Sequence, residues 1–178
     1  MISQSRIIGI GGVSRAGKSF LAKKMADFYT KSGVKVNILD QDNFVFPKDE
    51  IPRINGHIDW ESPESINFQH LNKLILNSRK SYDVTIVEGI LVFCNTDLIN
   101  LFDYKVFITL PKDEFIKRKR EDLRWGKEPE WYIEYIWEMH QNFGQLPQNY
   151  HANMVLDGRV IFNTEEILQK IKIPHPHY

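Results

Sequence analysis

Gly12-Val13-Ser14-Arg15-Ala16-Gly17-Lys18-Ser19 is the stretch that decides the fold of this 178-residue chain. It fits G-x-x-x-x-G-K-[ST], the phosphate-binding P-loop, without a mismatch. Gly12 and Gly17 remove the Cβ where the loop must turn, so consecutive backbone N–H groups can point into one anion-sized nest. Lys18 supplies a positive charge for the β- and γ-phosphates of a nucleotide, and the Ser19 hydroxyl is placed to ligate Mg²⁺. All eight residues are therefore predicted to bind the nucleotide.

The segments on either side of this loop support the motif. Arg6–Ile10 reads as a short buried strand, and Phe20–Tyr29 reads as a helix with Leu21, Met25 and Phe28 at i, i+4 and i+7. The helix points its positive dipole end at the anion held by the loop. A chance glycine turn before an ordinary helix would explain the loop alone, but not this order of strand, loop and helix. The order predicts a nucleotide-binding protein.

The composition is that of a soluble globular protein, with 42% hydrophobic and 26% charged residues. The length predicts one domain over residues 1–178. Because 23 basic and 23 acidic residues cancel, neither nucleic acid nor an anionic membrane is expected as a partner. A single cysteine, Cys94, excludes a disulfide within the chain. No signal peptide or membrane span is recognisable, which predicts a cytoplasmic setting.

Strands and helices are expected to alternate along the rest of the chain. This pattern behind a P-loop predicts an α/β fold, a parallel sheet flanked by helices. The long polar stretch Val45–Pro63 is expected to be a functional loop over the site, and Thr164 is expected to cap the last helix. The expected strands are 34–39, 84–87, 104–109 and 154–158, and the expected helices are 64–78, 96–101, one opening at Pro111, 131–139 and 164–170.

Glu88 is the candidate for a second Mg²⁺ ligand beside Ser19. It follows the β-branched run Val84–Val87 of a predicted central strand. A carboxylate in that place is costly unless it is paired or ligates a metal ion. The following Gly89 leaves open the alternative that Glu88 is only a turn or capping acid at the strand end.

Asp42 is the candidate for the group that faces the phosphoryl acceptor. It follows the predicted strand 34–39, at the carboxyl edge where open α/β sheets bind ligands. There it can act as a base, hold Mg²⁺ through its hydration shell, or do both. An Asx turn or helix cap is the alternative role, and Asp40, two residues earlier, is not distinguished from Asp42 by the sequence.

A run of cations predicts a lid at about residues 117–131. Lys117, Arg120 and Arg124 fall at i, i+3 and i+7, on one face of the helix expected after Pro111, whose Leu123 is expected to face the core. Arg120 and Arg124 are the favoured contacts to the nucleotide phosphates; a solvated helix face is the alternative for part of the run. His175 and His177 fit a frayed tail. The whole run is Lys117, Arg118, Lys119, Arg120, Arg124 and Lys127.

With these residues placed, the chain resembles the uridine kinase and nicotinamide riboside kinase family of P-loop nucleoside kinases. The resemblance implies a P-loop NTPase fold of the nucleoside and nucleotide kinase type with a short lid, and it implies ATP and Mg²⁺ as cofactors. It also implies Asp42 as the catalytic residue and Glu88 as a contact to Mg²⁺. Four segments carry it: residues 9–19, Gln41-Asp42-Asn43-Phe44, residues 55–66 and Ile86–Phe93.

The third segment is implied to hold the nucleoside. In the family an aromatic residue there stacks on the base and an acid binds the ribose hydroxyls, and these positions fall on Trp60 and Glu61. From the residues alone, a flat ring beside an acid suits a base joined to a diol, whereas a Trp that pins the loop to the core is the alternative. Glu61 stands where Asp is more usual, and the lid cations are spaced differently from the family pattern.

The expected activity is therefore ATP-dependent phosphorylation of the 5′-hydroxyl of a nucleoside of the nicotinamide riboside or uridine/cytidine type. Lys18 and Asp42 are the expected catalytic residues, and a small nucleoside and ATP are the expected partners. Asp40-Gln41-Asp42 also matches the D-x-D of shikimate-type kinases, which leaves another small hydroxyl acceptor as one alternative. A nucleotide-dependent switch is the second, although the guanine-reading N-K-x-D motif is absent from the sequence.

Overall fold

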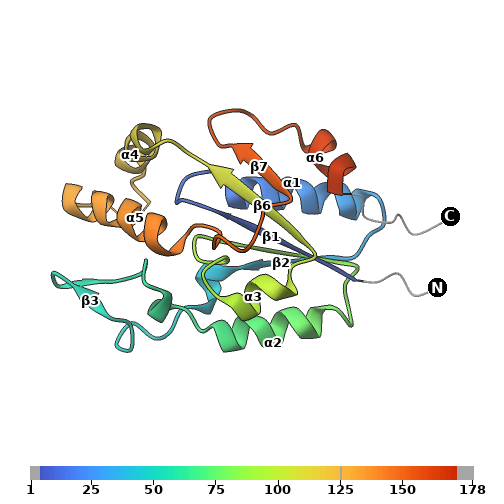
Figure 1. Cartoon of the computed structure of the whole chain (residues 1–178), viewed down its shortest axis with the longest axis horizontal. Helices are drawn as coiled ribbons and strands as arrows, with labels where there is room; N and C mark the ends of the chain where they lie inside the picture. Colours follow the sequence, from blue (N-terminus) through green and yellow to red (C-terminus); the bar gives the residue numbers. More distant parts are fainter. Residues whose placement is uncertain (1–4, 125, 172–178) are drawn as a thin grey trace.

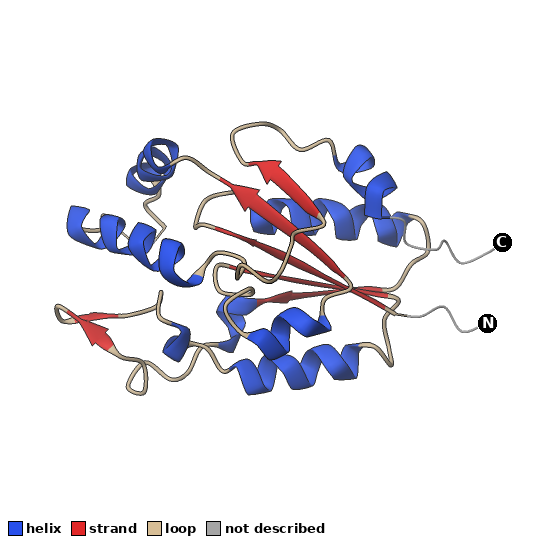
Figure 2. Cartoon of the chain, viewed as in Figure 1, coloured by secondary structure: helices blue, strands red, loops and turns tan. Residues whose placement is uncertain are grey.

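A five-stranded sheet with every strand parallel forms the centre of the molecule in a computed structural model, which describes residues 5–124 and 126–171 (Figures 1 and 2). The order β2-β5-β1-β6-β7 puts the strand that precedes the P-loop in the middle. The predicted parallel sheet is therefore confirmed. The strands are β1 (Arg6–Gly12), β2 (Val36–Asp40), β5 (Val84–Gly89), β6 (Tyr104–Thr109) and β7 (Met154–Asp157).

Two apolar clusters, one on each face of the sheet, make up the core. Residues of β5 alternate between them, because successive side chains of a strand point to opposite faces: Val84 and Ile86 belong to one cluster and Val87 to the other. The first cluster includes residues of α1, α4, α5 and α6, and the second includes residues of α2 and α3. The helices are α1 (Lys18–Lys31), α2 (Phe68–Ser78), α3 (Thr96–Leu101), α4 (Lys112–Glu121), α5 (Glu130–Phe143) and α6 (Thr164–Ile171).

The carboxyl ends of the strands face the part of the molecule that the sequence predicts to be functional. The arrowheads of β6 and β7 point toward the end at which α4, α5 and the strand β3 lie (Figure 1). The residues that follow β1, β2 and β5 along the chain are therefore gathered there. These are the P-loop, the segment after Asp40, and Glu88 with Gly89 at the end of β5.

The stretch Val45–Pro63 contains a β-hairpin that the sequence analysis did not predict. Strands β3 (Arg53–Ile54) and β4 (His57–Ile58) pair antiparallel around Asn55 and Gly56. Both turn residues have positive φ, 47° and 81°, which is the conformation that two-residue Asn-Gly hairpin turns adopt. This segment is therefore an ordered element rather than an open loop.

The helix expected at 64–78 begins four residues later, at Phe68. Pro63–Ser65 forms a 3₁₀ turn, and Ile66 pairs as an isolated β-bridge with Val45. The side chain of Asn67 accepts a hydrogen bond from the backbone N–H of His70 at 2.9 Å. An Asn in this position satisfies a free N–H group of the first turn and so fixes the start of the helix.

The helix that carries the lid cations ends earlier than the sequence predicts. It stops at Glu121, so Arg124 does not share a helical face with Lys117 and Arg120. Asp122 adopts an extended backbone, and its carboxyl accepts hydrogen bonds from the backbone N–H and the guanidinium of Arg124. Leu123 is 67% exposed instead of facing the core. The early stop thus places Arg124 in the loop between α4 and α5.

Two further expectations concern the last helix and the tail. The side chain of Asn163, not that of Thr164, accepts a hydrogen bond from the N–H of Glu166 at the start of α6, so Asn163 is the capping residue. His175 and His177 lie outside the described residues.

No helix within residues 5–124 and 126–171 combines the length and apolar character needed to cross a bilayer.

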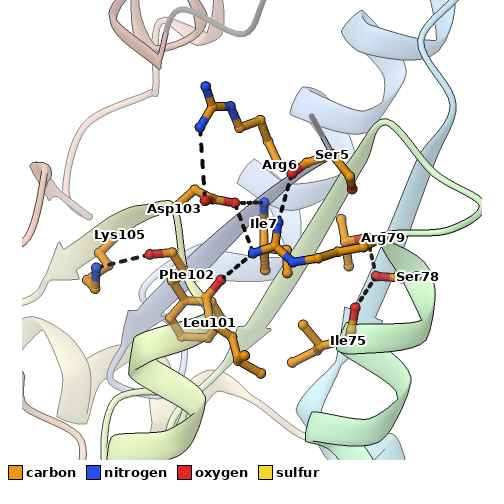
Figure 3. Close-up of polar contacts among 11 residues, drawn as sticks. Ser5, Arg6, Ile7, Ile75, Ser78, Arg79, Leu101, Phe102, Asp103 and Lys105 are labelled. Carbon is orange, nitrogen blue, oxygen red and sulfur yellow. Dashed lines mark hydrogen bonds and ion pairs between the residues drawn. The ribbon is translucent and has the colours of Figure 1, made fainter. Parts of the chain in front are cut away.

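A polar network closes the amino-terminal edge of the sheet (Figure 3), where β1 begins, whereas the P-loop follows the end of β1. The guanidinium of Arg79, directly after α2, donates to the carbonyls of Ser5 and Leu101 at 2.9 and 3.1 Å. It also reaches the carboxyl of Asp103 at 3.4 Å, and the same carboxyl accepts from the backbone N–H of Ile7 at 2.8 Å. One arginine therefore joins the start of β1 to the end of α2 and the segment between α3 and β6.

Candidate active site

The P-loop is closed around the ammonium group of its own lysine. Gly12 has a φ of 145°, and a Cβ there would lie 2.3 Å from the carbonyl oxygen of Ile108 on the neighbouring strand β6. Gly17 also has a positive φ, 104°, so both positions need glycine. Lys18 is 7% exposed, and its Nζ donates to the carbonyl of Val13 at 3.0 Å. The loop thus holds the cation where an anion can meet it.

Carboxyl groups from three separate segments act on this lysine. Burial lowers the pKa of Lys18, whereas the charges of four acids raise it. One acid ends β5, two belong to the segment around the end of β2, and one follows the β3–β4 hairpin. The acids, in decreasing order of effect, are Glu88, Asp42, Glu61 and Asp40. The fold therefore brings together the phosphate loop and all three acids to which the sequence analysis gave roles.

Glu88 and Ser19, which with Asp42 are the three residues predicted to hold Mg²⁺, lie close enough for the Ser19 hydroxyl to lower the pKa of the Glu88 carboxyl. Glu88 is 3% exposed at the end of β5. Burial raises the pKa of Glu88, while a hydrogen bond with the Ser19 hydroxyl and the charge of Lys18 lower it. Within the described residues no group of three or more His, Cys, Asp or Glu side chains is arranged to hold a metal ion. Mg²⁺ usually takes one or two carboxylates plus phosphate oxygens and water, so this pair fits it.

Asp42 lies in a 3₁₀ turn, Gln41–Phe44, directly after β2. The capping role that the sequence left open belongs to Asp40, whose side chain accepts from the backbone N–H of Asp42 at 2.9 Å. The Asp42 carboxyl makes no hydrogen bond to any described residue. Desolvation and the charge of Asp40 raise the pKa of Asp42, whereas Lys18 and Arg124 lower it. Asp42 is thus a carboxyl group on which Lys18 of the phosphate loop acts, with a pKa above that of an ordinary aspartate.

Gln41 is a site residue that the sequence analysis missed. It is 1% exposed, and its Oε1 accepts from the backbone N–H of Leu91 at 3.0 Å. A Cβ on Gly89 would lie 2.4 Å from the Cβ of Gln41, so only glycine fits beside it. This contact joins the ends of β2 and β5, which carry Asp42 and Glu88. A glutamine between two acids, directly after a predicted strand, was the available sequence signal.

Trp60 and Glu61 follow the hairpin directly. Trp60 is half-buried and belongs to neither apolar cluster of the described residues, which does not favour the alternative that it pins the segment to the core. Its carbonyl accepts from the Ser65 hydroxyl at 3.1 Å. Desolvation, together with the charges of Asp42 and other acids, raises the pKa of Glu61 to about 8. Glu61 therefore has neutral and charged forms close to physiological pH.

One lid cation acts by its charge on Glu61, and it is not one that the sequence analysis favoured. Lys119 is 7% exposed on α4, and its Nζ lies 2.9 Å from Oε2 of Glu128. The charge of Lys119 lowers the pKa of Glu61, while Glu128 raises it. This ion pair thus forms part of the surroundings of Glu61. The pair could have been suspected only from the position of Lys119 in the basic run, because the sequence carries no signal for the burial of one cation among six.

The remaining lid cations divide between the site and the surface. Arg118 donates to the carbonyl of Arg15 in the P-loop at 3.2 Å. Arg124 pairs with Asp122 at 2.7 Å, and Arg15 approaches the same carboxyl at 3.7 Å. The charge of Arg124 acts on Asp42, so Arg124 faces the site. Arg120 is 57% exposed and pairs with Glu130 at 2.7 Å; the fold does not bring it to the P-loop.

Solved structures of other proteins share this fold. A possible uridine kinase from Bacillus stearothermophilus superposes with a TM-score of 0.58 at 18% identity, over 88% of this chain and 91% of that one. Shikimate kinase from Aquifex aeolicus gives a TM-score of 0.54 at 18% identity, over 93% and 96% of the two chains. The parallel sheet with a P-loop after its central strand is the P-loop NTPase fold of these kinases, as predicted.

Curated relatives narrow the resemblance to nucleoside kinases. Nicotinamide riboside kinase from Saccharomyces cerevisiae is 23% identical, over 94% of this chain and 90% of that protein. Nicotinamide riboside kinase 1 from Homo sapiens is 26% identical, over 85% and 83%. Uridine kinase from Chlamydia pneumoniae is 27% identical, over 93% and 88%. No family model matches the chain. The chain thus has the P-loop NTPase fold and resembles nicotinamide riboside kinase and uridine kinase.

Proposed function

We propose that the protein transfers a phosphoryl group from ATP to the 5′-hydroxyl of a nucleoside of the nicotinamide riboside or uridine/cytidine type. The observation that carries this proposal is the convergence of Asp42, Glu61 and Glu88 on Lys18. Each acid comes from a different segment, and each has a separate task in the reaction. The resemblance to kinases named for nucleosides supports the choice of acceptor.

On the nucleotide side, the backbone N–H groups of Gly12–Ser19 and the ammonium of Lys18 bind the phosphates. Ser19 and Glu88 hold Mg²⁺, which neutralises phosphate charge when bound. Arg124 lies beside Asp42 and adds positive charge there. Because the transition state of phosphoryl transfer is loose, positioning and charge carry most of the catalysis.

On the acceptor side, Asp42 orients the hydroxyl and accepts its proton. Desolvation and Asp40 raise the pKa of Asp42, which makes it a better base than an ordinary aspartate. Trp60 provides a flat surface for the base, since stacking tolerates any heteroaromatic ring. Glu61 accepts hydrogen bonds from the ribose hydroxyls, and its charged form is the stronger acceptor.

The surroundings of Glu61 favour a polyhydroxyl acceptor over a carboxylate-bearing one such as shikimate. A carboxylate substrate needs arginines on the acceptor side. The cation that acts most on Glu61 is Lys119, which is already paired with Glu128. The carboxyl group of Glu61, the acids that act on it and the ring of Trp60 suit a neutral or cationic nucleoside better than an anion.

ADP release from MgATP, measured across nicotinamide riboside, uridine, cytidine, adenosine and shikimate, tests this proposal. Turnover is expected with at least one nucleoside. Asp42→Asn is expected to lower its kcat at least about 100-fold, the usual contribution of a positioned acid or base. Asp27→Asn, the same change at an exposed position of α1, is the matched control. Binding of ATP without turnover of any nucleoside would overturn the proposal.

A further inference from the structure

Asp59, buried at the end of the hairpin, shapes the turn that carries Glu61. Asp59 is 7% exposed. One carboxyl oxygen accepts from the backbone N–H groups of Glu61 and Ser62, both at 3.2 Å. The other accepts from the hydroxyl of Tyr135 at 2.6 Å. Both oxygens are thus used, and Trp60 lies within the turn that they close.

The hydroxyl of Tyr135 comes from α5, the helix that follows the lid. On the same face, Tyr132 donates to the carbonyl of Ile58 at 3.4 Å and its ring stacks on His57 at 5.7 Å. Residues three apart lie on one face of a helix, so a single face of α5 holds the end of the hairpin. The hairpin and α5 lie at the same end of the molecule in Figure 1.

We propose that Asp59 and Tyr135 are positioning residues that fix Glu61, and with it Trp60, for the nucleoside. The inference rests on the proposed function, because it is there that Glu61 and Trp60 are assigned to the nucleoside. Neither Asp59 nor Tyr135 needs to touch the substrate. They act through the backbone of the turn, and they link the position of α5 to the acceptor side of the site.

The physical reason is that the Asp59 carboxyl is the acceptor for the N–H groups of both Glu61 and Ser62. A buried carboxyl group is costly without partners, and a hydrogen bond of 2.6 Å from a hydroxyl to a carboxyl is a strong one. Without the Tyr135 hydroxyl, one Asp59 oxygen loses its partner and the carboxyl is free to rotate away from the N–H groups of Glu61 and Ser62. The P-loop is held by its own contact between Lys18 and Val13, so ATP binding does not depend on this turn.

Steady-state kinetics of Tyr135→Phe with both substrates tests the proposal. The KM for the nucleoside is expected to rise about tenfold, the effect of losing one hydrogen bond to a charged group, with kcat and the KM for ATP little changed. Asp59→Ala is expected to do the same or more, and Asp59→Asn less, because its amide oxygen still accepts from the two N–H groups. Tyr150→Phe, which removes a 2.9 Å bond to Asn100 on α3, is the matched control.

Amide hydrogen exchange followed by ¹⁵N NMR gives a readout that needs no activity. In Tyr135→Phe, the amides of Glu61 and Ser62 are expected to lose protection while those of the P-loop keep theirs. Unchanged protection of these two amides, or an equal rise in KM for both substrates, would overturn the proposal. If the wild type phosphorylates no nucleoside, the proposed function fails, whereas the exchange experiment still decides whether Tyr135 and Asp59 fix the turn.

Discussion

Glu61 is the residue at which charge and function are most closely linked. Desolvation is the largest cause of its raised pKa of about 8, and Lys119 opposes it. At neutral pH a large fraction of this side chain is therefore neutral in the free protein. A neutral carboxyl group accepts hydrogen bonds from a ribose diol more weakly than a carboxylate does.

The affinity for the nucleoside is therefore expected to depend on pH. As the pH rises from 6.5 to 8.5, which spans the pKa of about 8, Glu61 loses its proton and kcat/KM for the nucleoside should increase by up to about tenfold. Kinetic profiles at several pH values measure this, because kcat/KM reports groups of the free enzyme. Glu61→Gln, which has no proton to lose, should flatten the rise. A rise that persists in Glu61→Gln would assign it to another group, such as Asp42 or Glu88.

The same residue affects stability with a definite sign. The pKa of Glu61 is raised from 4.5 to about 8 on folding, so the folded protein binds the proton more tightly than the unfolded chain. The contribution of Glu61 to the free energy of unfolding is fully present below pH 4.5 and declines as the pH rises toward 8. Lys119 moderates this loss because its charge lowers the pKa of Glu61, whereas Glu128 adds to the loss because its charge raises that pKa.

At the scale of elements, the junction between β2 and β5 decides how Asp42 and Glu88 face each other. Gln41→Leu keeps the volume of the side chain but leaves the N–H of Leu91 without its acceptor. We expect a loss of about 1–3 kcal/mol in the free energy of unfolding, the cost of an unsatisfied buried donor. We also expect a lower kcat, since the two acids shift relative to each other.

Urea denaturation and steady-state kinetics check the two effects of Gln41→Leu separately. Gln69→Leu, the same change at an exposed position of α2, should leave both quantities unchanged. A variant of Gln41 as stable and active as the wild type would show that backbone pairing between β2 and β5 is enough to align the acids.

Sequence reasoning succeeded for elements whose signal is local and failed where contacts between elements decide. The strand Tyr104–Thr109 and the helix Thr96–Leu101 have the predicted bounds, because each is a short periodic run between turn residues. Asn-Gly is typical of two-residue hairpin turns, but the sequence analysis did not predict a hairpin at Asn55-Gly56. By contrast, the end of α4 at Glu121 depends on Asp122, Arg124 and Arg15 meeting in space.

The candidate site shows the same division. Motif residues such as Lys18, Asp42 and Glu88 could be predicted because their spacing follows the phosphate chemistry and the strand ends. Lys119 and Tyr135 could not, since their importance comes from burial and from partners far along the chain. No periodicity in one sequence distinguishes a lysine that is buried from the five cations around it.

At the scale of the whole molecule, the network around Arg79 should support stability without affecting the reaction. It lies at the amino-terminal edge of the sheet, whereas the P-loop lies at the other (Figures 1 and 3). Arg79→Ala removes the bonds to Ser5, Leu101 and Asp103. We expect a loss of about 2 kcal/mol, which lowers the Tm by about 4–8 °C in a chain of this size.

Differential scanning calorimetry measures that change, and both KM values should stay as in the wild type. Lys170→Ala, which removes an exposed ion pair with Glu166 on α6, should change the Tm little, because exposed pairs contribute little. An Arg79→Ala protein with wild-type Tm would mean that backbone pairing alone closes this edge. A changed KM would mean that the two edges are coupled through the sheet.

The bond between Asp59 and Tyr135 joins residues 76 positions apart in the chain, and this distance has a consequence for the order of folding. Contacts between distant residues form late, because closing a long loop costs entropy before any bond repays it. The P-loop and the strands β1, β2 and β5 all precede α5. During synthesis the phosphate side can therefore take shape first, and the growing chain acquires its acceptor side only when α5 arrives to hold the hairpin.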